Sequence, residues 1–255
     1  MKRVRVIPVL TVDNEKLVKT VKFKKPNYIG DPINAVKIFN EKEVDEIVLL
    51  DITATKEKRT PNFTFIEEIC SEAFMPFAYG GGITTLEQID QLFQLGIEKV
   101  ILNSCVENNL ALITKAASKY GAQSIVVSID VKKSLFGKYQ VYKQSGNKKV
   151  KLNLTDYLSQ IEKAGAGEIF INSIDNDGSY LGYDYPLIKL VSKEVNIPVV
   201  ACGGAKEVTS FLEAIKNGAS AVAAGSLFVY KGAAKGILIN YPSQQELTEQ
   251  VYNKI

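Results

Sequence analysis

The chain has 255 residues, 46% of them hydrophobic and 23% charged, which suffices for the core of one barrel-sized domain. Its net charge of +3 is too small to indicate a nucleic-acid partner, and no apolar stretch reaches the roughly 18 residues of a membrane span. Because the chain has no histidine, imidazole bases and histidine-bound metals are excluded, and neither a metal nor a cofactor is expected.

Short apolar runs alternate with helical patterns along the whole chain. The basic and then apolar start, residues 1–10, indicates a first strand and not a signal peptide, because no small-residue cleavage site follows it. Several runs are nearly continuous in valine, isoleucine, leucine and alanine, as strands buried on both faces are. The predicted strands span residues 4–10, 46–52, 76–79, 99–103, 124–129, 168–172, 198–202 and 219–224.

Amphipathic helices are predicted for residues 84–95, 207–217 and 244–254. The first begins with a capping box of Thr84 and Glu87, the second ends at Gly218, and the third begins with a second capping box of Ser243 and Glu246. Eight strands that alternate with helices predict an α/β fold, a single (β/α)8 TIM barrel over residues 1–255. The alternative, a doubly wound open sheet, has a glycine-rich turn after its first strand, and this chain has none there.

An internal repeat divides the chain into two half-barrels, residues 1–122 and 123–255 approximately. The segment PFAYGGG at residues 76–82 recurs as PVVACGG at residues 198–204, an offset of 122. The same offset relates Gly96 to Gly218 and Glu46 to Glu168. A register that holds across several elements predicts that the first four strands and the last four are copies of one unit.

Two glycine-rich corners are candidate phosphate sites. Glycine lets the backbone N–H groups approach an anion, and barrels commonly bind phosphate at the carboxyl ends of their strands. Each glycine pair is followed about twenty residues later by a small hydroxyl residue, which favours phosphate binding over the alternative of tight turns alone. The corner residues are Gly81, Gly82, Asn103 and Ser104, repeated as Gly203, Gly204, Gly225 and Ser226.

Carboxylates follow several predicted strands, where barrel enzymes hold their catalytic groups. Asp51 lies at the top of the second strand, Asp130 follows the fifth, and Asp177 lies after the sixth. When the ends of the first and fifth strands are matched as half-barrel copies, the partner of Asp130 is residue 11, which is a threonine; Asp13 is the alternative acid if the first strand continues.

Lysines crowd residues 16–25 and 132–151. Two solvated loops are the expected explanation, and a positive rim that attracts an anionic substrate is the alternative. The three cysteines, Cys70, Cys105 and Cys202, form no disulfide framework or zinc spacing, so a cytoplasmic location is expected.

The repeat and the segments LDITA (50–54), GGG (80–82), SID (128–130) and SIDNDG (173–178) resemble the cyclase subunit of imidazole glycerol phosphate synthase, over essentially the whole chain. The resemblance implies a (β/α)8 barrel of histidine biosynthesis that forms a heterodimer with a glutaminase docked on its N-terminal face. Ammonia from this partner cleaves a phosphorylated substrate, a ribulosyl-formimino bisphosphate, to imidazole glycerol phosphate and aminoimidazole carboxamide ribonucleotide.

The resemblance also implies residue roles. Asp130 matches one of two catalytic acids, with Asp51 and Asp177 beside it, and Lys19 matches a basic residue of a mobile first loop that contacts phosphate. Gly82, Asn103 and Ser104 match one phosphate site; Asp177, Gly178, Gly204, Gly225 and Ser226 lie on or beside the other. Arg5, Glu46, Lys99 and Glu168 match a charged ring through which ammonia enters, although four charges at strand starts also fit mutual salt bridges.

Two departures from this family bear on function. Thr11 stands where the family has its first catalytic aspartate, and the first loop, residues 18–32, lacks the usual glycine and arginine-aspartate. This loop is similar to a paralogous branch associated with glycosyl amidation, in which the barrel and a glutaminase supply ammonia to a separate sugar amidotransferase for surface glycans. Three hypotheses remain: a cyclase, an ammonia conduit with partner proteins, and an inactive structural relative.

Overall fold

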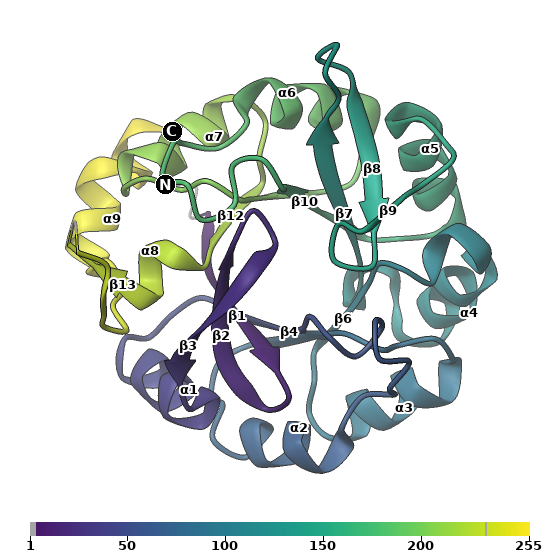
Figure 1. The fold of residues 1–255 in the computed structure, drawn as a ribbon, viewed down its shortest axis with the longest axis horizontal. Helices are drawn as coiled ribbons and strands as arrows, with labels where there is room; N and C mark the ends of the chain where they lie inside the picture. The colour runs from purple at the N-terminus through teal and green to yellow at the C-terminus, as the bar shows by residue number, and fades with distance from the viewer. Residues whose placement is uncertain (1–3, 233) are drawn as a thin grey trace.

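The parallel strands of the chain close into a barrel. The computed structural model describes residues 4–232 and 234–255, and the basic start of the chain, residues 1–3, lies outside them. Neighbouring barrel strands pair in chain order, and the last pairs with the first, which confirms the predicted (β/α)8 barrel (Figure 1). The barrel strands are β1 (Arg5–Asp13), β4 (Ile47–Asp51), β5 (Phe77–Gly80), β6 (Lys99–Leu102), β7 (Ile125–Lys133), β10 (Glu168–Ser173), β11 (Val199–Cys202) and β12 (Ala221–Ala224).

A ring of helices surrounds the barrel (Figure 1). Their apolar faces pack on the outer side of the strands and form most of the core. None of the described helices has the length and apolar composition that a membrane crossing requires. The helices are α1 (Pro32–Glu41), α2 (Phe63–Cys70), α3 (Leu86–Gln94), α4 (Leu110–Tyr120), α5 (Leu154–Ala164), α6 (Tyr185–Glu194), α7 (Thr209–Lys216), α8 (Ser226–Val229) and α9 (Gln244–Gln250), with short 3-10 turns at Val106–Asn108, Ala122–Ser124 and Tyr252–Lys254.

The start of α3 differs by one residue from the predicted capping box. Thr85 is the N-cap: its hydroxyl accepts the N–H of Gln88 at 3.3 Å, and the Gln88 side chain accepts the N–H of Thr85 at 3.2 Å. The box of Thr84 and Glu87 is therefore wrong, because glutamine serves as well as glutamate at the third helical position.

Two other helix predictions needed smaller corrections. Ser243 caps α9 as predicted, accepting the N–H of Glu246 at 3.1 Å, but the α-helix ends at Gln250. The helix predicted for residues 207–217 begins later, at Thr209. Helix ends depend on the last few hydrogen bonds and are the least determined part of a sequence pattern.

Both lysine-rich stretches form antiparallel hairpins at the mouth of the barrel and not loops, although most of their lysines are exposed to solvent as expected. Strands β2 (Lys16–Val21) and β3 (Lys24–Gly30) extend β1, while β8 (Tyr139–Lys143) and β9 (Lys148–Lys149) extend β7. The first strand of each half-barrel thus carries a hairpin. A further pair, β13 (Tyr230–Lys231) and β14 (Gly236–Ile237), stands apart from the barrel sheet.

Two lysines of these hairpins are buried. Lys19 and Lys143 are each 6% exposed, because Asp177 and Glu107 supply the opposite charge. Composition indicates solvent for such residues. Here partners distant in sequence allow burial, and Lys19 is thereby carried into the mouth of the barrel.

Candidate active site at the barrel mouth

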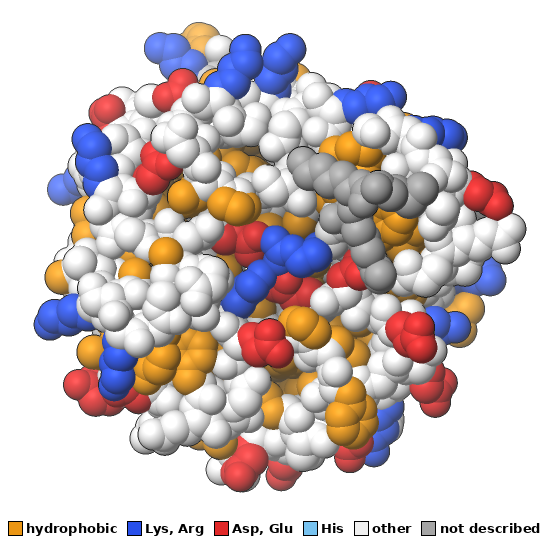
Figure 2. All heavy atoms as spheres, turned by 180° about the vertical axis from the view of Figure 1, so that it is seen from behind, with side chains coloured by type: hydrophobic (Ala, Val, Ile, Leu, Met, Phe, Trp, Pro, Cys, Tyr) orange, Lys and Arg blue, Asp and Glu red, His pale blue; other side chains and the backbone are white. Residues whose placement is uncertain are grey.

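The floor of the barrel holds a ring of two cations and two carboxylates. Arg5 donates hydrogen bonds to both Glu46 and Glu168, and Lys99 Nζ lies 2.9 Å from Glu46 Oε2 and 3.2 Å from Glu168 Oε2. Burial opposes the charged form of Arg5, but the two carboxylates outweigh it and raise its pKa. Figure 2 shows basic and acidic side chains gathered at the centre of this face. The structure therefore brings all four residues of the predicted ring together with their charges balanced.

Apolar side chains fill the barrel between this floor ring and the mouth. The inward-facing residues of β1 follow at every second position, as strand geometry requires. They run from Arg5 in the floor ring through Ile7 and Val9 to Thr11 in the mouth. Strand β10 repeats this order of charged, apolar and polar positions with Glu168, Phe170 and Asn172. The rest of the interior cluster consists of Val48, Ala78, Ile101, Val126, Val200, Cys202, Ala221 and Ala223.

The mouth of the barrel is a cavity of about 140 Å³ under the two hairpins. Lys19, Thr20 and Phe23 of the β2–β3 hairpin line it, as does Ser145 of the β8–β9 turn. Ser145 Oγ donates to the carbonyl of Ile52 at 2.8 Å and so ties the second hairpin to the opposite rim. Of the residues predicted from the sequence, the cavity is lined by Thr11, Lys19, Asp51, Gly81, Asn103, Ser104, Asp130, Asp177 and Gly225.

Thr11 and Asp130 occupy equivalent places in the two half-barrels. Thr11 is paired with Leu50 across β1 and β4, and Asp130 with Asn172 across β7 and β10. Leu50 and Asn172 are 122 residues apart, which is the offset of the repeat. The Thr11 hydroxyl donates to the carbonyl of Val18 in β2, so it fastens the hairpin.

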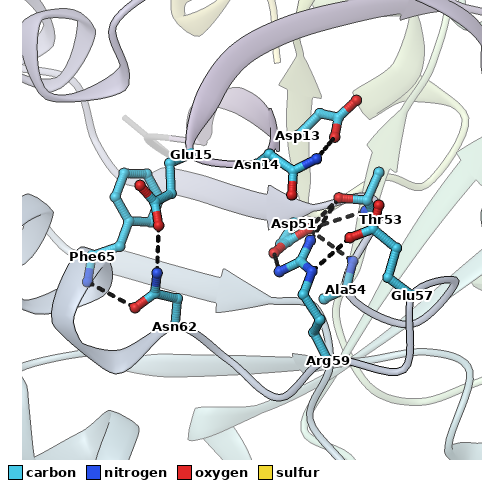
Figure 3. Close-up of polar contacts among 10 residues, drawn as sticks. All are labelled: Asp13, Asn14, Glu15, Asp51, Thr53, Ala54, Glu57, Arg59, Asn62 and Phe65. Atoms are coloured by element: carbon cyan, nitrogen blue, oxygen red, sulfur yellow. Dashed lines mark hydrogen bonds and ion pairs between the residues drawn. The ribbon is translucent and has the colours of Figure 1, made fainter.

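Asp13, the alternative acid considered for the mouth, lies outside the mouth cavity. It ends β1 opposite Lys16 and is absent from the described lining of the mouth cavity. Its carboxylate accepts a hydrogen bond from Asn14 Nδ2 at 3.0 Å, on the rim (Figure 3).

Asp130 has the properties of a general acid or base at neutral pH. Its carboxylate is buried, and burial raises the pKa of Asp130 to about 7. The negative charge of Asp177 acts in the same direction, whereas the hydrogen bond from Asn103 Nδ2 at 3.0 Å opposes it. A carboxyl group with a pKa near 7 exchanges protons readily at physiological pH.

Asp177 connects the β2–β3 hairpin to the barrel. Lys19 Nζ lies 2.9 Å from Asp177 Oδ1, and the N–H of Lys22 donates to the Asp177 carbonyl at 3.0 Å. Gly178 follows with φ of +66°, and a Cβ there would lie 2.9 Å from the Thr20 carbonyl. The hairpin thus rests directly on this turn, which holds Lys19 over the mouth.

Asp51 is fully engaged in hydrogen bonds within the β4–α2 loop (Figure 3). Its Oδ1 accepts the N–H groups of Thr53 and Ala54 at 3.0 and 2.9 Å, and its Oδ2 lies 3.2 Å from Arg59 NH1. Arg59 in turn contacts Glu57. With both oxygens occupied, Asp51 organises this loop and is poorly placed to transfer a proton.

The first predicted phosphate corner is open and contains two lysines. Its cavity of about 230 Å³ is lined by Gly81, Gly82, Asn103 and Ser104 together with Lys143 and Lys148. Lys143 is paired with Glu107, whereas Lys148 is exposed near the corner. These two lysines were not assigned to the corner from sequence, because the hairpin that brings them there was not predicted.

The second corner is much smaller. Gly178, Gly203, Gly204, Gly225 and Ser226 surround a cavity of about 20 Å³. The Tyr180 hydroxyl donates to the Ser226 carbonyl at 2.9 Å beside it. The half-barrel repeat therefore relates the glycines of the two corners but not the space around them.

Alanine at Gly204 is expected to destabilise the fold by about 3 kcal/mol. Gly204 has φ of +107°, and a Cβ there would lie 2.2 Å from the carbonyl oxygen of Gly182, so backbone strain and a backbone clash add. Gly96 is the matched control, because it has φ of +95° with open space around it, and alanine there should cost about 1 kcal/mol. Equal urea midpoints for the two variants would contradict this.

Asn172 was missed by the sequence analysis. It lines the mouth next to Asp130, and its buried Oδ1 has no hydrogen-bond partner within the described residues. The signal that could have pointed to it is its place as the last residue of the predicted strand 168–172, at the mouth end. Across the described chain, no group of three or more acidic or cysteine side chains is placed to hold a metal ion.

Fold and site together define a (β/α)8-barrel protein with carboxylates in its mouth and paired charges at its floor. The chain belongs to the histidine biosynthesis protein family, whose model matches residues 5–235.

Several relatives in this family carry synthase names. A protein of Pseudomonas aeruginosa strain PAO1, named provisionally as imidazole glycerol phosphate synthase subunit hisF2, is 47% identical over 97% of this chain and 99% of its own length. A Vibrio vulnificus protein, named provisionally as subunit hisF3, is 48% identical over 96% of this chain and 95% of its own. Imidazole glycerol phosphate synthase subunit HisF of Alkaliphilus metalliredigens is 40% identical over 89% of this chain and 90% of its own length.

Proposed function

We propose that this chain is the barrel subunit of an amidotransferase that accepts ammonia from a glutaminase and passes it to a sugar amidotransferase for a surface glycan. The observation that carries the proposal is Thr11. It stands at the position equivalent to Asp130, where the family resemblance implies a second catalytic aspartate, and its hydroxyl donates to the Val18 carbonyl. A mouth that keeps only one of the two catalytic acids implied by the resemblance is better suited to delivering ammonia than to a cyclisation that needs both an acid and a base.

The apolar interior between the floor and the mouth supports the transfer of uncharged ammonia in this proposal. Uncharged ammonia can cross the apolar interior around Phe170 and Val126, whereas ammonium would lose its hydration there at a large cost. The floor ring of Arg5, Glu46, Lys99 and Glu168 is the entry in this proposal. The word subunit in the names of the relatives supports a heterodimer, with the glutaminase docked at the floor.

The pattern of identities supports a paralogue over an ordinary cyclase. The relatives with provisional names, numbered or not, are 44–48% identical to this chain, and those with the unqualified name HisF, such as the Alkaliphilus protein, are 40–42% identical. This difference supports a branch apart from the ordinary cyclases.

The alternative is an authentic cyclase that forms imidazole glycerol phosphate and aminoimidazole carboxamide ribonucleotide from the ribulosyl-formimino bisphosphate. The pKa of about 7 at Asp130 favours it, since the remaining acid is tuned for proton transfer. In this case Asp130 is the catalytic acid, the corners of Gly82 and Gly204 hold the phosphates, and Lys19 closes over the substrate.

Turnover of the ribulosyl-formimino bisphosphate by the purified chain in excess ammonium salt separates the two functions. Free ammonia removes the need for the glutaminase, so the assay reports on the barrel alone. We expect turnover at least about 100-fold below that of the Alkaliphilus protein, because one acid–base group contributes roughly 10²–10⁴. Thr11→Asp should restore part of it, and Thr11→Asn, of similar shape but without the acid, should not. Turnover equal to that of the Alkaliphilus protein would establish the cyclase instead.

A further inference from the structure

The β7–β8 hairpin presents two apolar side chains at its tip. Leu135 and Phe136 are 101% and 92% exposed, and Figure 1 shows this hairpin projecting past the helix ring. The turn itself is ordered: the N–H of Ser134 donates to the Lys138 carbonyl at 2.8 Å, and the N–H of Gly137 to the Ser134 carbonyl at 2.9 Å. A regular turn thus holds both apolar side chains fully in water.

The base of the hairpin is fixed to the loop that follows β10. The N–H of Lys133 donates to Asp175 Oδ2 at 2.8 Å, while Asp184 receives the Tyr139 hydroxyl at 2.8 Å and pairs with Lys133 Nζ at 3.0 Å. Asp184 is buried and also caps α6 by accepting the N–H of Leu187. Because these contacts pin the base, the tip has a defined position on the molecule. Exposed apolar groups on a rigid element are typical of a docking surface.

The charges around the tip indicate which kind of partner surface it fits. Residues 131–155 contain seven lysines and no aspartate or glutamate. Lys132 and Lys138 flank the tip, are exposed, and have no carboxylate partner within the described residues. The surface therefore fits an apolar pocket rimmed by carboxylates.

Rival occupants suit this surface less well. A second copy of the chain would bring two lysine-rich surfaces together, which repel. Two apolar side chains bury less area than one myristoyl chain, and even that gives only marginal membrane binding. A protein with an acidic rim remains the best match.

The tip follows the carboxyl end of β7, at the end of the barrel opposite to the floor ring. We infer that the Leu135–Phe136 tip docks the sugar amidotransferase that receives the ammonia, at an apolar pocket rimmed by acidic residues. This inference rests on the proposed function, which places the glutaminase at the floor and the exit of ammonia at the mouth. Docking at the mouth brings the acceptor enzyme to the point of release.

The test is a reconstitution of this chain with its glutaminase and the sugar amidotransferase of the same organism. Leu135→Ser/Phe136→Ser should lower glutamine-dependent sugar amidation at least about tenfold, because ammonia then escapes into solution. Activation of the glutaminase and amidation driven by added ammonium salt should both stay unchanged. The matched control is Ile237→Ser/Leu238→Ser, which also removes two exposed apolar side chains, 55% and 48% exposed, but away from the hairpin. It should leave every rate unchanged.

The outcomes separate the inference from the proposed function. If the wild-type chain supports no glutamine-dependent amidation, the proposed function fails, and the docking inference with it. If the wild type supports it and the tip variant equals the wild type, only the docking inference is overturned. Two further results would also overturn it: tip-dependent binding to vesicles of anionic phospholipid without any binding to the amidotransferase, or a tip-dependent dimer of the chain alone. Binding to the immobilised amidotransferase that weakens between about 50 and 200 mM salt, levels chosen to span about a twofold change in screening length, would support it.

Discussion

Replacing Asp130 with asparagine is expected to make the protein more stable at pH 8 and to abolish the acid–base capacity of its mouth. An aspartate has a pKa of about 3.9 in an unfolded chain, while burial raises that of Asp130 to about 7. The folded state therefore favours the protonated form. The free energy of unfolding contributed by Asp130 is fully present below about pH 4 and is lost as the pH rises through 7.

The size of this effect follows from the pKa difference. Roughly three pKa units correspond to an upper value on the order of 4 kcal/mol, and relaxation around the charge reduces it. The amide oxygen of the introduced asparagine can still accept the hydrogen bond from Asn103, so the variant should gain about 2–3 kcal/mol over the wild type at pH 8 and little at pH 4.5.

Urea denaturation at the two pH values measures this difference. Glu67→Gln, a neutralised carboxylate on the exposed side of α2, is the control and should change stability equally at both. If Asp130→Asn raises the free energy of unfolding by the same amount at pH 4.5 and pH 8, Asp130 ionises with an ordinary pKa. The stability gained by removing a buried carboxylate is a sign that the residue is kept for its chemistry.

The second large effect is expected at the floor ring. Glu168→Gln removes one of two carboxylates shared by Arg5 and Lys99 and leaves the ring with a net positive charge. A fully buried pair broken in this way costs about 3–5 kcal/mol. The Arg5 side chain is 33% exposed, so solvent screens part of the excess charge and we expect a loss of about 2 kcal/mol.

A double-mutant cycle tests the balance of charge. Lys99→Gln combined with Glu168→Gln restores neutrality and should recover at least half of the loss, measured by urea denaturation. If the stability losses of the two single variants simply add in the double variant, the charges of the ring are not energetically coupled. If the proposed function holds, Glu168→Gln should also lower glutamine-dependent sugar amidation. Amidation driven by ammonium salt should stay the same, since only ammonia from the glutaminase passes through the ring.

Much of the site was open to prediction because it follows from local pattern. The end of each barrel strand places its residue at the mouth, so Asp130, Asn103 and Asp177 could be assigned there from strand positions alone. Asn172 was missed although it ends the predicted strand 168–172, since a single polar residue at the end of an apolar run gives a weak signal. Thr20, Phe23 and Ser145 could not be found, because the hairpins that carry them to the cavity depend on pairing with distant strands.

By itself the sequence determined the barrel, the repeat of 122 residues and a threonine, not a carboxylate, at position 11, because alternating burial and chain order are properties of the residues themselves. Only the tertiary structure decided which charged groups are buried, paired or shifted in pKa. It buried Lys19 against Asp177, occupied both oxygens of Asp51, and raised the pKa of Asp130 to about 7. Burial and ion pairing depend on groups brought together from distant parts of the chain, and the electrostatic state of a side chain is set by those neighbours.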